Sequence, residues 1–227
     1  MTTENLPVLA ILGGTGDLGT GLARRWAQAG YRVIIGSRTL EKAEAATADL
    51  REVMAERGIG DVEVEAMENL AAAEAADIVT LTVPFSHQAS TLEYVKPALQ
   101  GKILIDVTVP LVPPKVARVQ LPEGGSAGQI AQTILGEEVA VVSAFQNVAA
   151  HHLQEGKGLD CDVLVCGNKK DARAQVITLV EAAGMKGYHA GMIYNAAAAE
   201  ALTSVLITIN KQYSCHAGIK ISGLGDA

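Results

Sequence analysis

Residues Val8–Ala23 read VLAILGGTGDLGTGLA, and this stretch decides the fold. Val8–Leu12 is a continuous apolar run, which is typical of a buried strand. Three glycines with the spacing Gly-x-Gly-x-x-Gly follow, and Leu18 and Leu22 then recur at helical spacing. A strand, a tight glycine turn and a helix form the opening of a Rossmann unit, so the stretch predicts a dinucleotide site.

Each glycine of the motif has a separate role in that geometry. Gly14 permits the turn, Gly16 lets the backbone approach a pyrophosphate, and Gly19 lets the helix pack on the strand. The N–H groups and the positive end of the new helix then face the phosphates. A lone Gly-x-Gly-x-x-Gly match is weak evidence, but its place between a strand and a helix near the chain start makes it specific.

The composition fits one doubly wound body. The chain has 227 residues, of which 49% are hydrophobic and only 4% aromatic, as expected for a parallel sheet buried under helices on both faces. We expect an α/β fold of the Rossmann type, with a mainly parallel sheet and a small C-terminal α/β lobe. The predicted boundary lies near residue 150, giving a nucleotide-binding domain over 1–150 and a lobe over 151–227.

The expected elements follow from apolar periodicity and from glycine or proline breaks. Further strands are predicted at Tyr31–Ile35, Val62–Met67, Asp77–Val83, Lys102–Asp106, Val139–Ser143, Asp162–Cys166 and Lys186–His189. Helices are predicted at Glu41–Arg57, Glu68–Ala76, Gln88–Leu99, Ala127–Leu135, Lys169–Ala183 and Asn195–Tyr213.

Charge and hydropathy exclude several partner classes. The net charge is −7 with no basic block, which argues against nucleic acid. No apolar run reaches the ~20 residues of a membrane span, and Met1–Leu6 does not have the pattern of a signal peptide. We therefore expect a cytoplasmic protein that acts on small molecules without a membrane partner.

The cysteines and histidines do not predict a metal site. Cys161 and Cys166 flank a predicted strand and point to opposite faces, so buried structural thiols are expected. His151 and His152 are adjacent, and in a helix their side chains diverge by about 100°.

The exit of the second strand indicates which dinucleotide binds. An NAD site places Asp or Glu there for the ribose 2′-OH, whereas this chain has Ser37 and Arg38, with Lys42 one helical turn on. Arginine binds phosphate through a fork of donors, and Thr15 of the glycine loop can reach the same place. A solvated basic start of a helix is the alternative. We predict NADP(H) over NAD(H).

Two loops at the carboxyl end of the expected sheet are candidate ligand contacts. Phe85-Ser86-His87 follows a buried strand, and His87 is either a site residue near the pyrophosphate or nicotinamide ribose, or an ordinary loop histidine. The proline-rich loop Val107–Pro114 can form one wall of a pocket for a flat ring, or it is an ordinary turn.

The chain lacks the usual proton donor of a carbonyl reductase. None of its tyrosines has a lysine four residues on. Carbonyl reduction needs such an acid, whereas hydride transfer between two redox rings needs only that they be stacked and kept dry. We therefore predict no catalytic acid or base, with His87 and Lys211 left open as unrecognised acids.

Five stretches together resemble a known family. They are LAILGGTGDLGTGLA, VIIGSRTLEKAE, ADIVTLTVPFSHQ, VVSAF and DVLVCGN, and the likeness to the NADPH-dependent coenzyme F-420 (also written F420) reductases runs from Val8 to near Lys220. The resemblance implies reversible hydride transfer between NADP(H) and a 5-deazaflavin. It also implies that the lobe over 151–227 closes over the deazaflavin.

The resemblance implies three groups of cofactor contacts. They are Thr15, Gly16, Asp17 and Leu18 for the pyrophosphate; Ser37, Arg38 and Lys42 for the 2′-phosphate; and Val83, His87, Val109 and Ala150 for the ribose and nicotinamide. The chain departs from archaeal-type members, which have Trp-Glu at Phe85-Ser86 and Leu-His-Thr at Phe145–Asn147. The resemblance implies that these positions face the side of the second substrate.

Several alternatives stay open. They are an NADPH-dependent ferric or flavin reductase, a non-enzymatic NADP(H)-sensing regulator, and a 6-phosphogluconate- or pyrroline-carboxylate-type dehydrogenase, whose long helical C-terminal domain is missing here. The leading hypothesis predicts a dry apolar cleft between Val107–Pro114, Ala144–Ala150 and the C-terminal lobe, with no buried acid. The apolar last helix is either a homodimer face, as we expect, or simply core.

Overall fold

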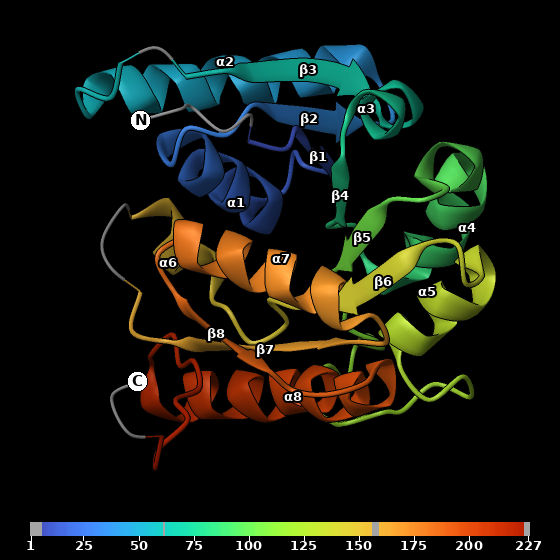
Figure 1. The fold of residues 1–227 in the computed structure, drawn as a ribbon. Helices are drawn as coiled ribbons and strands as arrows, with labels where there is room; N and C mark the ends of the chain where they lie inside the picture. The colour runs from blue at the N-terminus through green and yellow to red at the C-terminus, as the bar shows by residue number, and fades with distance from the viewer. Residues whose placement is uncertain (1–5, 61, 156–158, 225–227) are drawn as a thin grey trace.

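A single eight-stranded sheet organises the chain. The computed structural model describes residues 6–60, 62–155 and 159–224, and within them the strand order is β3-β2-β1-β4-β5-β6-β7-β8 (Figure 1). Neighbouring strands are parallel except β6 and β7. The strands are β1 Leu9–Leu12, β2 Val33–Ser37, β3 Val64–Glu68, β4 Ile78–Leu81, β5 Ile103–Asp106, β6 Ala140–Ser143, β7 Asp162–Gly167 and β8 Lys186–His189. The predicted α/β Rossmann-type fold is confirmed.

Helices cover both faces of the sheet. They are α1 Asp17–Gln28, α2 Leu40–Glu56, α3 Asn69–Ala75, α4 Phe85–Val95, α5 Ala127–Leu135, α6 Ala150–Gln154, α7 Lys170–Ala182 and α8 Ala196–Tyr213, with 3₁₀ turns at Lys96–Leu99 and Ile193–Asn195. Alternate residues of β1 enter opposite cores, because side chains alternate across a strand. Leu9 and Ile11 pack with α1, α2 and α7, whereas Ala10 and Leu12 pack with α3, α4 and α5.

Trp26 of α1 packs against residues from the second half of the chain. Its side chain is fully buried, its indole N–H donates to the carbonyl of Leu179 in α7 at 2.8 Å, and its ring meets Phe145 edge-on with centroids 6.0 Å apart. Phe145 follows β6 with a left-handed backbone (φ 72°), which is rare for a bulky residue. The packing against Trp26 therefore holds the chain at its exit from β6.

The C-terminal strands extend the same sheet. β7 pairs with β6 in antiparallel register, with Ser143 opposite Cys166, and α6 packs against α1. Arg24 and Arg25 of α1 donate to the carbonyls of Gln154 and His152 at 2.6 and 3.0 Å. The division into 1–150 and 151–227 stays a prediction. Within the described ranges, no helix is long and apolar enough to cross a membrane.

Most predicted elements match within two residues, but α4 begins earlier than expected. The helix was predicted from Gln88 and starts at Phe85, so His87 lies in its first turn and the loop placement is wrong. The carbonyl of Pro84 accepts a hydrogen bond from the His87 N–H at 2.8 Å, which makes Pro84 the N-cap of the helix. The buried thiol is confirmed for Cys166, whereas Cys161 is only partly buried.

Candidate functional site

The glycine turn after β1 leaves space at one position only. The left-handed residue is Gly13 (φ 69°), so the turn depends on this glycine as well as on Gly14. A Cβ atom on Gly14 would lie 2.7 Å from the carbonyl oxygen of Ile11, and one on Gly19 would lie 2.7 Å from the Cα atom of Gly14. A Cβ atom on Gly16 would meet no atom within 4 Å. Gly16 therefore borders open space at the N-terminus of α1, where a phosphate would approach.

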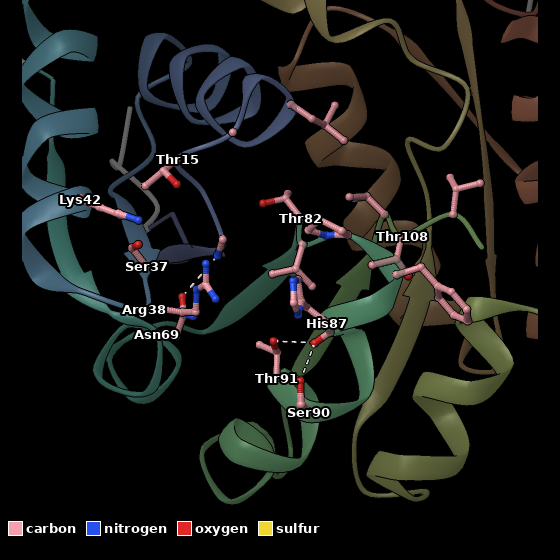
Figure 2. A pocket seen from close by; sticks show the side chains of 18 of the residues that line it. Thr15, Ser37, Arg38, Lys42, Asn69, Thr82, His87, Ser90, Thr91 and Thr108 are labelled. Carbon is pink, nitrogen blue, oxygen red and sulfur yellow. Dashed lines mark hydrogen bonds between the residues drawn. The ribbon is translucent and has the colours of Figure 1, made fainter. Parts of the chain in front are cut away.

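A cavity of about 580 Å³ lies along the carboxyl ends of β2, β1, β4 and β5 (Figure 2). This is the edge where open α/β sheets bind ligands, and the volume is in the range of cofactor sites. Most of the cofactor residues predicted from sequence line it: Thr15, Gly16, Leu18, Ser37, Arg38, Lys42, Val83, His87 and Val109. Asp17 and Ala150 are not among its described lining residues. Asp17 is exposed at the start of α1, and Ala150 begins α6.

One end of the cavity is cationic. Ser37 is the last residue of β2, Arg38 lies between β2 and α2, and Lys42 lies in the first turn of α2. Figure 2 shows these side chains gathered beside Thr15 at the same end of the cavity. A serine hydroxyl, a guanidinium and an ammonium beside a helix N-terminus suit a phosphomonoester.

His87 lies on the α4 side of the cavity. Its side chain is exposed, and its carbonyl accepts hydrogen bonds from the hydroxyls of Thr91 at 2.7 Å and Ser90 at 3.2 Å (Figure 2). Ser90 and Thr91 also line the cavity. The first two turns of α4 therefore place several polar residues at the cavity.

Polar residues missed in the sequence reading also line the cavity. The side-chain carbonyl of Asn69 accepts from the N–H of Gly13 at 3.3 Å, which supports the glycine turn from α3. The hydroxyl of Thr82 donates to the carbonyl of Leu12 at 3.0 Å, and Thr108 lies at the end of β5. The sequence feature that could have identified Asn69, Thr82 and Thr108 is that each is a polar residue just beyond the carboxyl end of a strand.

The apolar wall of this cavity is the first part of the proline-rich loop. Val107, Val109 and Leu111 line it, as predicted for Val107–Pro114. Phe145 and Asn147 are instead buried at 1% and 6% exposure. The residues after them, Val148 and Ala149, line a separate cavity of about 290 Å³, so Val107–Pro114 and Ala144–Ala150 do not line the single expected cleft.

The carboxyl groups of Asp106 and Glu200 are buried, although neither residue is among the described lining residues of the cavity. Asp106 ends β5 and is fully buried, and Glu200 in α8 is 1% exposed. Burial raises the pKa of Asp106 to about 6, against hydrogen bonds from Thr108 and Gln88. Burial raises the pKa of Glu200 to about 7, against backbone N–H groups of Gly128 and Ala127. Asp106 lies behind Thr108 and does not itself line the cavity formed by the described residues.

The histidines come together without forming a metal centre. The rings of His151 and His216 lie 4.7 Å apart, and those of His152 and His216 lie 5.6 Å apart, measured between centroids. In the part of the chain that the structure describes, no group of three or more His, Cys, Asp or Glu side chains is arranged to hold a metal ion.

Comparison with known proteins gives a consistent result. Residues 8–110 match the family model described as NADP oxidoreductase coenzyme F420-dependent. The chain is 40% identical to the F420-dependent NADP reductase of Methanocaldococcus jannaschii over 222 residues, which cover 95% of this chain and 98% of that protein. It is 40% identical to the F420-dependent NADP reductase of Methanothermobacter marburgensis over 223 residues, again 95% and 98% of the two chains.

A solved structure shares the fold over the same range. A crystal structure from an Arthrobacter species, provisionally described as an F420-dependent NADP-reductase, has a TM-score of 0.75 and 27% identity to this chain. The superposition covers 92% of this chain and 96% of the other. The structural likeness therefore extends over nearly the whole of both chains and is not limited to the nucleotide-binding half.

Proposed function

The chain belongs to the family of coenzyme F420-dependent NADP oxidoreductases, and from this we propose that it transfers a hydride reversibly between NADP(H) and coenzyme F420. The relatives named for this activity match it over nearly their whole length. The names of these relatives do not support a ferric or flavin reductase, and they favour an enzyme over a non-enzymatic NADP(H)-sensing regulator.

The observation that carries the proposal is the shape and charge of the larger cavity. Its cationic end, formed by Ser37, Arg38 and Lys42, suits the 2′-phosphate that distinguishes NADP(H) from NAD(H). Its middle borders Gly16, where a Cβ atom would project into open space. A dinucleotide held at both places would extend toward the apolar wall beyond β4 and β5.

The residues of the chain would bind and orient the two substrates. Val83, Val109 and Leu111 offer an apolar surface for a flat ring, and the backbone of the glycine turn offers N–H groups to the pyrophosphate. The nicotinamide supplies or accepts the hydride, and the protein holds the rings in contact and excludes water. We infer that no side chain acts as acid or base, since the buried carboxyls of Asp106 and Glu200 are hydrogen-bonded groups outside the described lining.

We further propose that the C-terminal part, 151–227, closes the deazaflavin side. Asn147 supports this link, because its amide donates to the carbonyl of Ala199 at 2.8 Å and so joins the exit of β6 to α8. The expected homodimer also stays a proposal. Helix α8 exposes Val205 and Tyr213 at 43% and 73%, and those side chains are available to a second copy.

A direct assay tests the activity. Purified protein is mixed with NADPH and oxidised coenzyme F420, and the loss of the long-wavelength absorbance of the deazaflavin is followed. NADH in place of NADPH and FMN in place of F420 are the controls. Rapid bleaching with NADPH and F420, and with neither control, is the expected result.

The alternative outcome is equally clear. Tight NADPH binding without bleaching of F420 would contradict the proposed F420 reductase activity and would favour the NADP(H)-sensing regulator. Equal bleaching of FMN would favour a general flavin reductase.

A further inference from the structure

Thr108 lines the cavity and carries an almost fully buried hydroxyl. It follows β5, it is 3% exposed, and its side chain lines the cavity (Figure 2). A dinucleotide with its 2′-phosphate beyond β2 and its pyrophosphate beyond β1 reaches β4 and β5 with its nicotinamide end. Thr108 is therefore a polar group at the nicotinamide end of the site.

Asp106 fixes the direction of this hydroxyl. One carboxylate oxygen of Asp106 lies 2.7 Å from the Thr108 Oγ1 and accepts the Thr108 backbone N–H at 2.9 Å. A carboxylate can only accept hydrogen bonds, and a hydroxyl has a single hydrogen. The Thr108 hydroxyl must therefore donate that hydrogen to Asp106.

Gln88 holds the network from the side of α4. Its amide nitrogen lies 2.5 Å from the other carboxylate oxygen of Asp106, 2.9 Å from the carbonyl of Ala127 and 2.9 Å from the Thr108 Oγ1, and these three acceptors share its two hydrogens. A side-chain amide nitrogen only donates, so it cannot accept the Thr108 hydrogen. The hydroxyl thus has lone pairs, and no hydrogen, to offer to the cavity.

We propose that Thr108 accepts a hydrogen bond from the amide N–H of the nicotinamide carboxamide, and that Asp106 is the positioning residue that keeps its hydroxyl an acceptor. The inference rests on the proposed use of NADP(H). In this proposal Thr108 and Asp106 fix the orientation of the carboxamide, and thereby the orientation of the nicotinamide ring that carries it.

A cofactor analogue tests the contact without changing the protein. In the 3-acetylpyridine analogue of NADPH, a methyl group replaces the carboxamide nitrogen and the carbonyl is kept. The Kd values of NADPH and of the reduced analogue are measured by titration without F420. Wild-type protein should prefer NADPH by about fivefold, the value of one neutral hydrogen bond. Equal affinity would overturn the proposal.

Variants localise the preference. In Thr108→Val, which keeps the shape and loses the hydroxyl, the preference for NADPH should fall to about onefold. Thr108→Ser should restore it, and Thr178→Val, an exposed threonine of α7, should keep the wild-type value. A preference that persists in Thr108→Val, or that Thr108→Ser does not restore, would refute the assignment.

The pH dependence of the ratio tests the role of Asp106. Below a pH of about 6, protonated Asp106 can donate to Thr108 and free the threonine hydrogen for the cavity. The preference should then decline from pH 8 to pH 5. Glu200 of α8 is a charged group that interacts with Asp106, whereas Gln88 and Thr108 are uncharged.

The ratio isolates this effect from other titrations. Protonation of the 2′-phosphate changes the affinity of both ligands alike and therefore cancels in the ratio. If the ratio of the two Kd values stays constant from pH 5 to pH 8, Asp106 is not the positioning residue. Failure of NADPH itself to bind would instead overturn the proposed function, so the two failures are distinguishable.

Discussion

The carboxylate of Glu200 accepts a hydrogen bond from the backbone N–H of Ala127 at 2.7 Å. Its other oxygen accepts from the N–H of Gly128 at 3.0 Å. Helix α8 thereby caps the first turn of α5 with a buried carboxylate, which satisfies two N–H groups that have no partner within that helix. The negative charge also lies at the positive end of the helix dipole.

This contact predicts an unusual pH dependence of stability. Burial raises the folded-state pKa of Glu200 from 4.5 to about 7, so the folded protein binds more protons than the unfolded chain between these values. The free energy of unfolding should therefore fall as pH rises from about 4.5 to 7, by about 3 kcal/mol for this group. The raised pKa of Asp106 acts in the same direction below about pH 6.

Urea denaturation of Glu200→Gln at several pH values from 4.5 to 7.5 checks this prediction. The variant should be less stable at low pH, because one oxygen acceptor is replaced, and it should lose much of the decline with pH. Glu93→Gln, at an exposed position of α4, should retain the wild-type decline. An identical decline in wild type and Glu200→Gln would contradict the assignment.

Two substitutions in the glycine turn should separate binding from folding. Gly16→Ala places a methyl group where no atom lies within 4 Å, so stability should change by about 1 kcal/mol or less, while NADPH affinity falls at least about tenfold. Gly19→Ala places it 2.7 Å from the Gly14 Cα and should cost about 1–3 kcal/mol of stability. Thermal unfolding and NADPH titration measure both effects. Unchanged NADPH affinity in Gly16→Ala would refute the pyrophosphate assignment.

Arg38 should distinguish the two nicotinamide cofactors. Arg38→Ala removes a charged donor from the cationic end of the cavity and should weaken NADPH binding by about 1.5–3 kcal/mol, with little effect on NADH. Isothermal titration with each cofactor measures the difference, and Arg118→Ala on an exposed loop is the matched control. Equal losses for NADPH and NADH would show that Arg38 does not contact the 2′-phosphate.

His87 should act through binding rather than chemistry. It lies exposed on the first turn of α4 and lines the cavity, so His87→Ala should lower NADPH affinity by about fivefold, the scale of one hydrogen bond. Single-turnover reduction of F420 at saturating NADPH should remain within about twofold of wild type. A loss of rate with unchanged affinity would make His87 a proton-transfer group instead.

Local sequence was sufficient for the first half of the site. The glycine turn and the group Ser37, Arg38 and Lys42 each follow directly from one strand of the first Rossmann unit, so the spacing along the chain fixes their position in space. The same reasoning made the loop Val107–Pro114 a candidate wall or an ordinary turn, and four of its residues line the cavity. Local sequence did not predict the start of α4, which begins at Phe85 with Pro84 as its N-cap instead of at Gln88.

The α/β class, the glycine turn after β1 and the cationic exit of β2 could be predicted from the sequence alone, because each depends on neighbours in the chain. The tertiary structure alone decided the buried network, in which Gln88, Asp106 and Glu200 come from three separate elements that meet at the start of α5. Apolar periodicity gives no sign of a buried carboxyl. Its position depends on hydrogen bonds that exist only once distant elements have packed together.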